Sequence, residues 1–68
     1  MALPDRIYEA RKRKLSLTQA ELAAELGVEP VTVSRWERGV VEPRPAVIRE
    51  IARMSGMPVS WFFTEEAA

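Results

Sequence analysis

The sequence contains no cysteine and no histidine among its 68 residues. Disulfides are therefore excluded, and so are the usual sulfur and imidazole ligands of zinc. The side chains that most often act as nucleophile and general base are also missing. There is no glycine-rich phosphate loop, and no two carboxylates have a spacing that suggests an acid and a base in one pocket. We therefore expect a protein that is not an enzyme, with no cofactor, no metal and no small-molecule substrate.

Long apolar runs are absent as well. No stretch approaches the roughly 20 apolar residues needed to span a bilayer, and the first residues do not have the pattern of a signal peptide. We expect no membrane association and a cytoplasmic location. A chain of this length fits a single domain over residues 1–68. Because so small a domain has a thin core, regular helix packing must stabilise it, with or without a partner subunit.

The chain has no excess charge of either sign, because ten basic and ten acidic residues cancel. This balance counts mildly against a nucleic-acid-binding protein, which is often basic. The distribution is uneven, however. Residues 11–14 form a continuous basic run, three more arginines lie between residues 35 and 44, and Glu65 and Glu66 follow near the end. A neutral total can therefore still include a basic face that attracts phosphates.

Periodicity and capping residues predict an all-α domain without strands. The predicted helices cover residues 5–14, 19–26, 30–38, 45–55 and 59–63. Thr18 and Glu21 have the spacing of a capping box just before an apolar run, and Pro30 suits the first turn of a helix. A glycine follows the second, third and fourth helices, where a left-handed residue commonly ends a helix.

The predicted helix over residues 30–38 has two faces of different chemistry. At about 100° per residue, Val33 and Trp36 share one side and can be buried. The opposite side and its flanks contain Val31, Thr32, Ser34, Arg35 and Arg38. Arginine can bind guanine through two hydrogen bonds, a small apolar group can contact a thymine methyl, and hydroxyls and further arginines can hold phosphates. Periodicity alone leaves an ordinary solvated face as an equal alternative.

The connection to the preceding helix favours the DNA-binding interpretation. A helix, a short turn containing glycine and a second short helix form the layout of a helix-turn-helix. Ala23 lies midway along the first of these two helices, where a small side chain lets them cross closely. We therefore predict that the helix over residues 30–38 enters the major groove of double-stranded DNA.

An ordered set of segments resembles the Cro/phage-repressor (XRE-type) helix-turn-helix family. The segments are LTQAELA (17–23), LGV (26–28), VSRWERG (33–39), IARMSGM (51–57) and VSWFF (59–63). The resemblance covers roughly residues 7–63. It implies a compact five-helix, lambda-repressor-like fold in which the second and third helices form the helix-turn-helix. It also implies a transcriptional regulator, a repressor that binds a near-palindromic operator as a homodimer.

The resemblance also implies roles for individual residues. Contacts to the bases are assigned to Pro30, Val31, Thr32 and Arg35. Contacts to the DNA backbone are assigned to Gln19, Ser34, Arg38 and Arg13, although the basic run that contains Arg13 is equally compatible with simple solvation. Gln19 is also expected to support the recognition helix. Glu37 matches an acid that pairs inward with a basic residue of the first helix, here Lys12 or Arg11.

Three positions depart from the family pattern. Glu29 stands where serine or threonine is commoner, and its carboxylate can cap the third helix or accept a hydrogen bond from a cytosine amino group. Pro30 replaces a residue that is frequently polar, so fewer side chains remain to contact bases. Ser16 replaces a common glycine between the first two helices, which matters only if that position requires a positive φ.

Residues 61–63 are three consecutive aromatics in a short helix, and they cannot all face inward. An exposed apolar spot often marks an interface. We therefore predict a dimer interface formed by Trp61, Phe63 and Met57. The alternative is that Phe62 closes the core while its two neighbours are half-buried. Val40 and Val41 either extend this interface or pack beneath the helix over residues 45–55.

Two other functions remain open at this point. The first is a protein-interaction module with a helix-turn-helix fold, which the zero net charge and Glu29 favour. The second is the DNA-binding part of a larger regulator or of an antitoxin. The sequence alone gives neither the operator nor the regulated genes.

Overall fold

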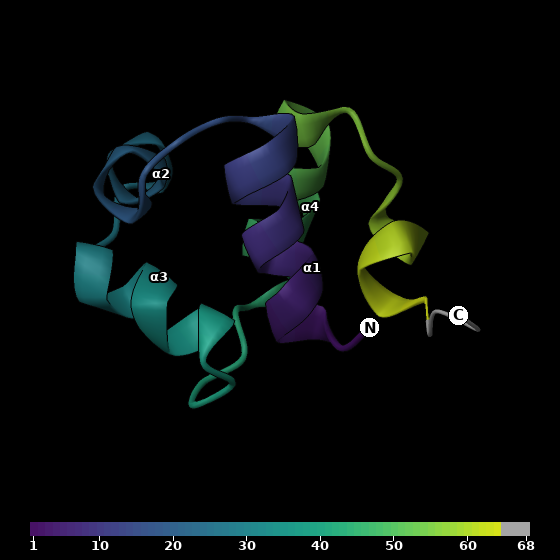
Figure 1. The fold of residues 1–68 in the computed structure, drawn as a ribbon, viewed down its shortest axis with the longest axis horizontal. Helices are drawn as coiled ribbons and strands as arrows, with labels where there is room; N and C mark the ends of the chain where they lie inside the picture. The colour runs from purple at the N-terminus through teal and green to yellow at the C-terminus, as the bar shows by residue number, and fades with distance from the viewer. Residues whose placement is uncertain (65–68) are drawn as a thin grey trace.

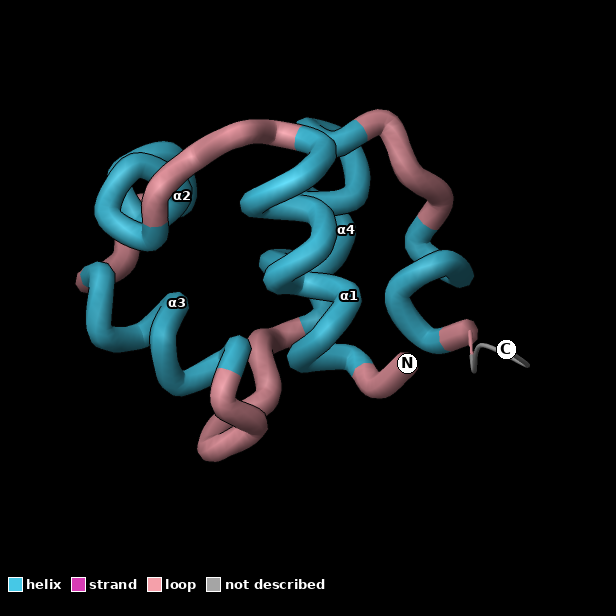
Figure 2. Tube along the Cα trace, in the orientation of Figure 1, coloured by secondary structure: helices cyan, strands magenta, loops and turns pink. Residues whose placement is uncertain are grey.

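Four α-helices, one π-helical segment and one 3₁₀ turn occur in the part of the chain that the computed structural model describes, residues 1–64. In chain order the elements are α1 (Leu3–Glu9), η1 (Ala10–Lys14), α2 (Gln19–Leu26), α3 (Pro30–Glu37), α4 (Pro45–Ser55) and η2 (Val59–Phe63). Figure 2 shows helices joined by loops, with no strand over these residues. The all-α prediction is thus confirmed. The predicted fifth helix is wrong in type, because η2 is a single stretch of 3₁₀-helix.

Local signals fix both ends of α2 and the start of α3. The Thr18 hydroxyl accepts a hydrogen bond from the Glu21 backbone N–H at 3.0 Å, and the Glu21 carboxylate accepts one from the Thr18 N–H at 2.8 Å. Gly27 ends α2 with a φ of 72°, a left-handed conformation that glycine adopts without steric cost. Pro30 is the first residue of α3, where its missing N–H leaves no bond unmade.

The first helix differs from its predicted form at both ends. It starts at Leu3, and the Asp5 carboxylate accepts a hydrogen bond from the Ala2 N–H at 3.2 Å. It continues as the π-helical segment η1, in which the Leu15 N–H donates to the Ala10 carbonyl at 2.9 Å, five residues back. Ser16 follows with a φ of 55°. The position therefore does need a positive φ, which explains why glycine is common there in the family that the sequence resembles.

Figure 1 shows α1 and α4 in the middle of the molecule, with α2 and α3 on one side and η2 on the other. Every one of these elements contributes to a single hydrophobic core. Its buried members are Ile7, Ala10, Leu22, Ala23, Val33, Trp36, Ile48, Ile51, Ala52 and Phe62. None of the helices formed by residues 1–64 is long and apolar enough to cross a bilayer.

Only one face of α3, the face of Val33 and Trp36, packs against the hydrophobic core. Val33 is fully buried and Trp36 is 4% exposed, so both predictions are confirmed. Ala23 of α2 is also buried, and α2 and α3 pack against each other more extensively than any other pair of elements. A larger side chain at Ala23 would push the two helices apart. This packing leaves the opposite face of α3 directed away from the protein.

Candidate nucleic-acid interface

The outer face of α3 combines exposed apolar and basic side chains. Val31 is 47% exposed, and Pro30, Arg35 and Arg38 are also exposed. The two hydroxyl residues that flank this face are partly buried, and one of them, Thr32, lines a groove together with the loop before α4. The face therefore presents a short methyl-bearing side chain in the first turn, followed by two cations within about two turns of helix.

The two arginines of this face form no ion pair within residues 1–64. Among residues 1–64, the carboxylates that form ion pairs contact Arg11, Arg13 and Arg53, and none contacts Arg35 or Arg38. Pairing therefore neutralises basic residues elsewhere and leaves those of α3 available. This explains how a chain with zero net charge still presents a basic face.

A hydrogen bond links the last turn of α3 to the residue that follows it. The Arg38 side chain donates from Nε to the Ser34 Oγ at 3.2 Å. The Arg38 backbone N–H also donates to the Ser34 carbonyl, at 3.0 Å. The Ser34 hydroxyl is thus already engaged by a neighbouring arginine in the absence of any ligand.

A partly buried polar network connects three elements behind α3. The Arg11 guanidinium donates from Nε and Nη2 to the Glu37 carboxylate at 2.6 and 3.0 Å, and from Nη1 to the Leu17 carbonyl at 2.8 Å. Gln19 donates from its amide to the same carboxylate at 3.0 Å. The network joins η1, the start of α2 and the end of α3, and it fixes the orientation of α3 relative to the other two.

Arg11, and not Lys12, is therefore the partner of Glu37. Lys12 is exposed and forms no ion pair within the described part of the chain, so that alternative is wrong. One residue changes the direction of a side chain by about 100°. The π-helical turn of η1 directs Arg11 toward the interior and Lys12 toward solvent.

The arginine of this network, Arg11, stays positively charged. The hydrogen bond that Arg11 donates to Glu37 raises the pKa of Arg11, and this effect outweighs the lowering of the pKa by burial. Arginine is protonated at any physiological pH even without such a partner. The orientation of α3 therefore does not depend on the titration of Arg11.

Gln19 has a structural role in the free protein. One hydrogen of its amide is used for Glu37, and the second remains available to another acceptor. The side chain is half-buried at the first position of α2. It connects α2 to α3 in the way the sequence predicted, and its predicted phosphate contact stays a prediction.

Glu29 does not cap α3 with its side chain, so that prediction is wrong. Its backbone has the extended conformation of an N-cap residue, but the carboxylate makes no capping hydrogen bond and is exposed. The reason lies in the neighbouring amides. An N-cap side chain accepts from the second or third N–H of its helix, and here the third, that of Thr32, donates to the Glu29 carbonyl at 2.9 Å.

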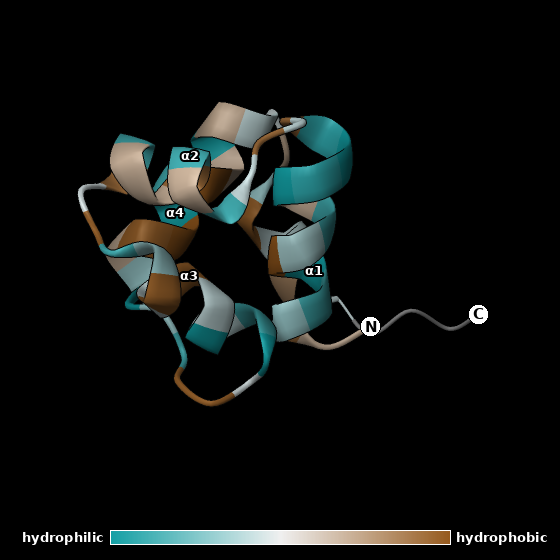
Figure 3. Cartoon of the chain, turned by 60° about the vertical axis from the view of Figure 1, so that its left-hand side comes forward, coloured by the Kyte–Doolittle hydropathy of each residue, from teal (hydrophilic) through white to brown (hydrophobic). Residues whose placement is uncertain are grey.

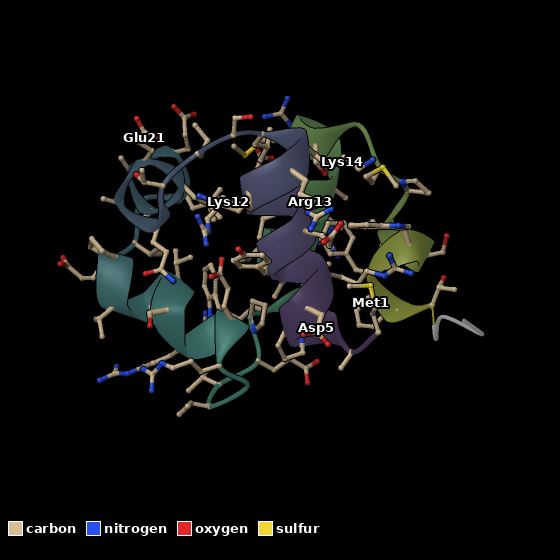
Figure 4. All side chains as sticks on the ribbon, viewed as in Figure 1. Met1, Asp5, Lys12, Arg13, Lys14 and Glu21 are labelled. Atoms are coloured by element: carbon tan, nitrogen blue, oxygen red, sulfur yellow. The ribbon has the colours of Figure 1, made fainter. Side chains whose placement is uncertain are left out.

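The basic run of η1 does not form one surface. Figure 4 places Lys12 on the side of the helix that faces α2, whereas Arg13 and Lys14 lie on the side toward η2. Arg13 also pairs with Glu9, one turn earlier, at 3.4 Å. Of the residues predicted to contact the DNA backbone, Arg13 is the one whose charge is already shared with a carboxylate.

Only one of the three predicted interface residues is well exposed. Phe63 is 55% exposed, whereas Met57 and Trp61 are partly buried against the core. The Arg6 guanidinium lies 4.5 Å from the centre of the Trp61 ring, and Phe62 meets that ring edge-on and is fully buried.

An apolar groove missed by the sequence analysis lies beside Phe63. It is lined by Pro45, Ile48, Arg49, Val59 and Phe63. Val59 is 39% exposed. The sequence offered one sign of this groove, because Val59 is an apolar residue at the start of the segment that contains the three aromatics. The groove joins the start of α4 to η2, and it is the surface on which Phe63 lies.

Val40 and Val41 are exposed at the tip of the loop between α3 and α4, which Figure 3 shows as a hydrophobic stretch away from the helices. Val40 therefore does not pack beneath α4, whereas Val41 lines a groove together with Val47 of α4. No cluster of three or more carboxylates that could hold a metal ion occurs within residues 1–64.

Two helices joined by a short turn, with the second anchored by its inner face and polar on its outer face, define a helix-turn-helix domain. A sequence model of the helix-turn-helix family matches residues 7–62. The chain belongs to this family, and within it to the Cro/phage-repressor (XRE) type.

Solved structures with the same fold include the P22 c2 repressor. A crystal structure of that protein in complex with a synthetic operator has a TM-score of 0.79 and 27% sequence identity, and the match covers 97% of this chain and 98% of the other. The solution structure of the P22 c2 repressor DNA-binding domain has a TM-score of 0.76 and 29% identity, over 91% of this chain and 80% of the other. No curated protein sequence matches the chain significantly.

Proposed function

We propose that this protein binds double-stranded DNA sequence-specifically and acts as a transcriptional repressor in the cytoplasm. The observation that carries the proposal is the outer face of α3, where exposed Arg35 and Arg38 have no carboxylate partner among the described residues. The P22 c2 repressor, whose fold this chain shares, has been solved with a synthetic operator. The proposed activity is binding, with no catalytic step.

Recognition of the bases is assigned to the first turn and the middle of α3. Arg35 bonds the major-groove edge of a guanine, and Val31 contacts a thymine methyl. Pro30 and Thr32 lie on either side of Val31 and complete the surface that enters the groove. Because Thr32 is partly buried whereas Arg35 is exposed, we assign Thr32 a smaller share of the readout than Arg35.

Contacts to the phosphates hold α3 in register. Arg38 and Ser34 lie at the end of α3, and Gln19 lies at the start of α2, where the N–H groups of the helix and its dipole favour an anion. Arg13 is a weaker candidate, since it pairs with Glu9 in the free protein. These contacts contribute affinity for any duplex, whereas Arg35 and Val31 contribute the preference for one sequence.

The finer part of the proposal is a homodimer on a near-palindromic site. A single α3 contacts only a few base pairs, and two copies related by a twofold axis contact two half-sites. The groove beside Phe63 supports this part, because it exposes apolar side chains of α4 and η2. Phe63 and Val59 are the exposed apolar side chains of this groove, and Trp61 and Met57 are partly buried against the core.

Selection of bound fragments from random duplex DNA tests the proposal. We expect one enriched sequence with two related half-sites, and binding that weakens steeply as salt is added, because phosphate contacts release counterions. A protein-interaction module, which the exposed apolar groove would suit, predicts the opposite result. If no sequence is enriched and no duplex is retained at low salt, the proposed function is wrong.

A further inference from the structure

The guanidinium of Arg38 is held by the residue one turn before it. Ser34 accepts two hydrogen bonds from Arg38, one at its carbonyl from the backbone N–H and one at its Oγ from Nε. The first fixes where the Arg38 side chain leaves the helix, and the second fixes the direction of its far end. Arg38 nevertheless remains exposed to solvent.

The bond to Nε leaves the outer edge of the guanidinium free. Arginine has five N–H donors, and four of them lie on the two terminal nitrogens. One N–H on each terminal nitrogen points along the end of the guanidinium, and this end-on pair is not used by the bond from Nε to Ser34. Two parallel donors on such an edge match two oxygens of a phosphate. Arg38 can therefore bind an anion end-on, through its two terminal nitrogens. It cannot bind the anion side-on through Nε while Nε donates to Ser34.

No other group of the described chain competes for this edge. No carboxylate of residues 1–64 forms an ion pair with Arg38. The negative end of the α3 dipole lies at its last turn and attracts the cation to this position. Arg35 differs, because within residues 1–64 its side chain makes no hydrogen bond and can adapt to a base.

We infer that Ser34 is a positioning residue that orients Arg38 for a DNA phosphate, and that Ser34 does not itself bind phosphate. This inference rests on the proposed function and refines it. In the proposed function, Arg38 and Ser34 each contact a phosphate. In this refinement only Arg38 contacts the phosphate, and Ser34 orients Arg38 by accepting its hydrogen bond. Because a phosphate is present at every nucleotide, the effect should be independent of DNA sequence.

A double-mutant cycle on a short fluorescent duplex of mixed sequence tests the inference. Ser34→Ala should weaken binding about threefold to tenfold when Arg38 is present, and should have no effect in the Arg38→Ala chain. The salt dependence separates the two residues further. Arg38→Ala should reduce the slope of log affinity against log salt by about 0.9, whereas Ser34→Ala should leave the slope unchanged.

Two further measurements keep the result interpretable. Ser34→Thr keeps a hydroxyl at the same position and should restore the affinity that Ser34→Ala loses. In the protein without DNA, NMR should detect a slowly exchanging Arg38 Hε that becomes fast in Ser34→Ala, while circular dichroism shows the same helix content.

Three outcomes would overturn the inference. Equal losses from Ser34→Ala in both backgrounds would mean that Ser34 contacts phosphate directly. No loss in either background would mean that the hydrogen bond does not influence binding. If the unmodified protein fails to bind any duplex, the proposed function fails first and the inference fails with it, and this result is distinct from the other two.

Discussion

Ser16 has the least favourable backbone conformation in the described chain. It is the only residue other than glycine with a positive φ among residues 1–64. The left-handed region brings Cβ close to the following carbonyl oxygen, which costs roughly 1–2 kcal/mol for a residue with a side chain. The strain follows the π-helical end of the first helix and redirects the chain toward α2.

Replacing this residue by glycine should therefore stabilise the protein. Ser16→Gly removes the Cβ strain but gains backbone entropy in the unfolded chain, so we expect a net gain of about 0.5–1 kcal/mol. For a domain of this size, thermal unfolding should shift upward by a few degrees. Ser16→Ala is the matched control, since it removes the hydroxyl and keeps the Cβ. Equal unfolding temperatures for the glycine and alanine variants would show that Ser16 is not strained.

Sequence reasoning succeeded for residues whose place follows from periodicity. Val33 and Trp36 were predicted to be buried because they share one side of a helix, and the structure confirms this. It failed at Glu29, because capping depends on which amides are still free. The Thr32 N–H, one of the two that an N-cap side chain can reach, donates to the Glu29 backbone carbonyl, and the sequence does not reveal this bond.

At the scale of elements, the orientation of α3 depends on the network around Glu37. The Arg11 and Glu37 side chains are 8% and 7% exposed, so each would be left in a poorly solvated site without its partner. Arg11 has its pKa raised by this contact. Its stabilisation is therefore present below the pKa of Arg11 in the unfolded chain and is lost only as the pH rises through the higher folded value, far above neutrality.

Removal of one partner should destabilise the fold strongly. Arg11→Met leaves the Leu17 carbonyl without this donor and the buried Glu37 carboxylate with the Gln19 amide but no cation, and we expect a loss of about 3 kcal/mol or more in the free energy of unfolding. The double variant Arg11→Met/Glu37→Leu should recover part of that loss, because no buried charge remains. Chemical denaturation measures both effects. Lys12→Met, one residue away and exposed, should change stability by less than about 0.5 kcal/mol; a similar loss in this control would contradict the assigned pair.

The boundaries of α2 and α3 were predictable because local chemistry determines them. A capping box, a left-handed glycine and a proline each act within a few residues. The type of η1 and η2 was not predictable in the same way. A π-helical turn and a 3₁₀ turn differ from an α-helix by one hydrogen-bond position, and packing of Arg11 and Phe62 against distant elements accompanies each of them.

At the scale of the whole molecule, the distribution of charge matters more than its sum. Ion pairs neutralise arginines of the first helix and of α4, while the arginines of α3 stay unpaired within residues 1–64. Glu65 and Glu66, which made the sequence look acidic at its end, lie outside the described residues. The zero total was therefore a poor guide to the surface that α3 presents.

The proposed dimer can be tested through the exposed ring of Phe63. Phe63→Ser should lower the affinity for a site with two half-sites and abolish cooperative binding of two copies, while the affinity for one half-site stays unchanged. Titration of both DNA forms, followed by sedimentation, measures this. Val40→Ser is the control, because Val40 is 61% exposed in a loop on the other side of α1 in Figure 1. Cooperative binding by the Phe63 variant would exclude this surface as the dimer interface.

The central claim is that the exposed face of α3 recognises base pairs, and the affinity of Arg35→Ala for a selected duplex tests it most directly. The matched control is Arg53→Ala, which removes the same charge from an exposed position on α4. We predict that Arg35→Ala costs about 1–3 kcal/mol of binding free energy and loses the preference at one base pair, whereas Arg53→Ala binds like the unmodified protein. Equal affinity and equal sequence preference in the two variants would contradict the account.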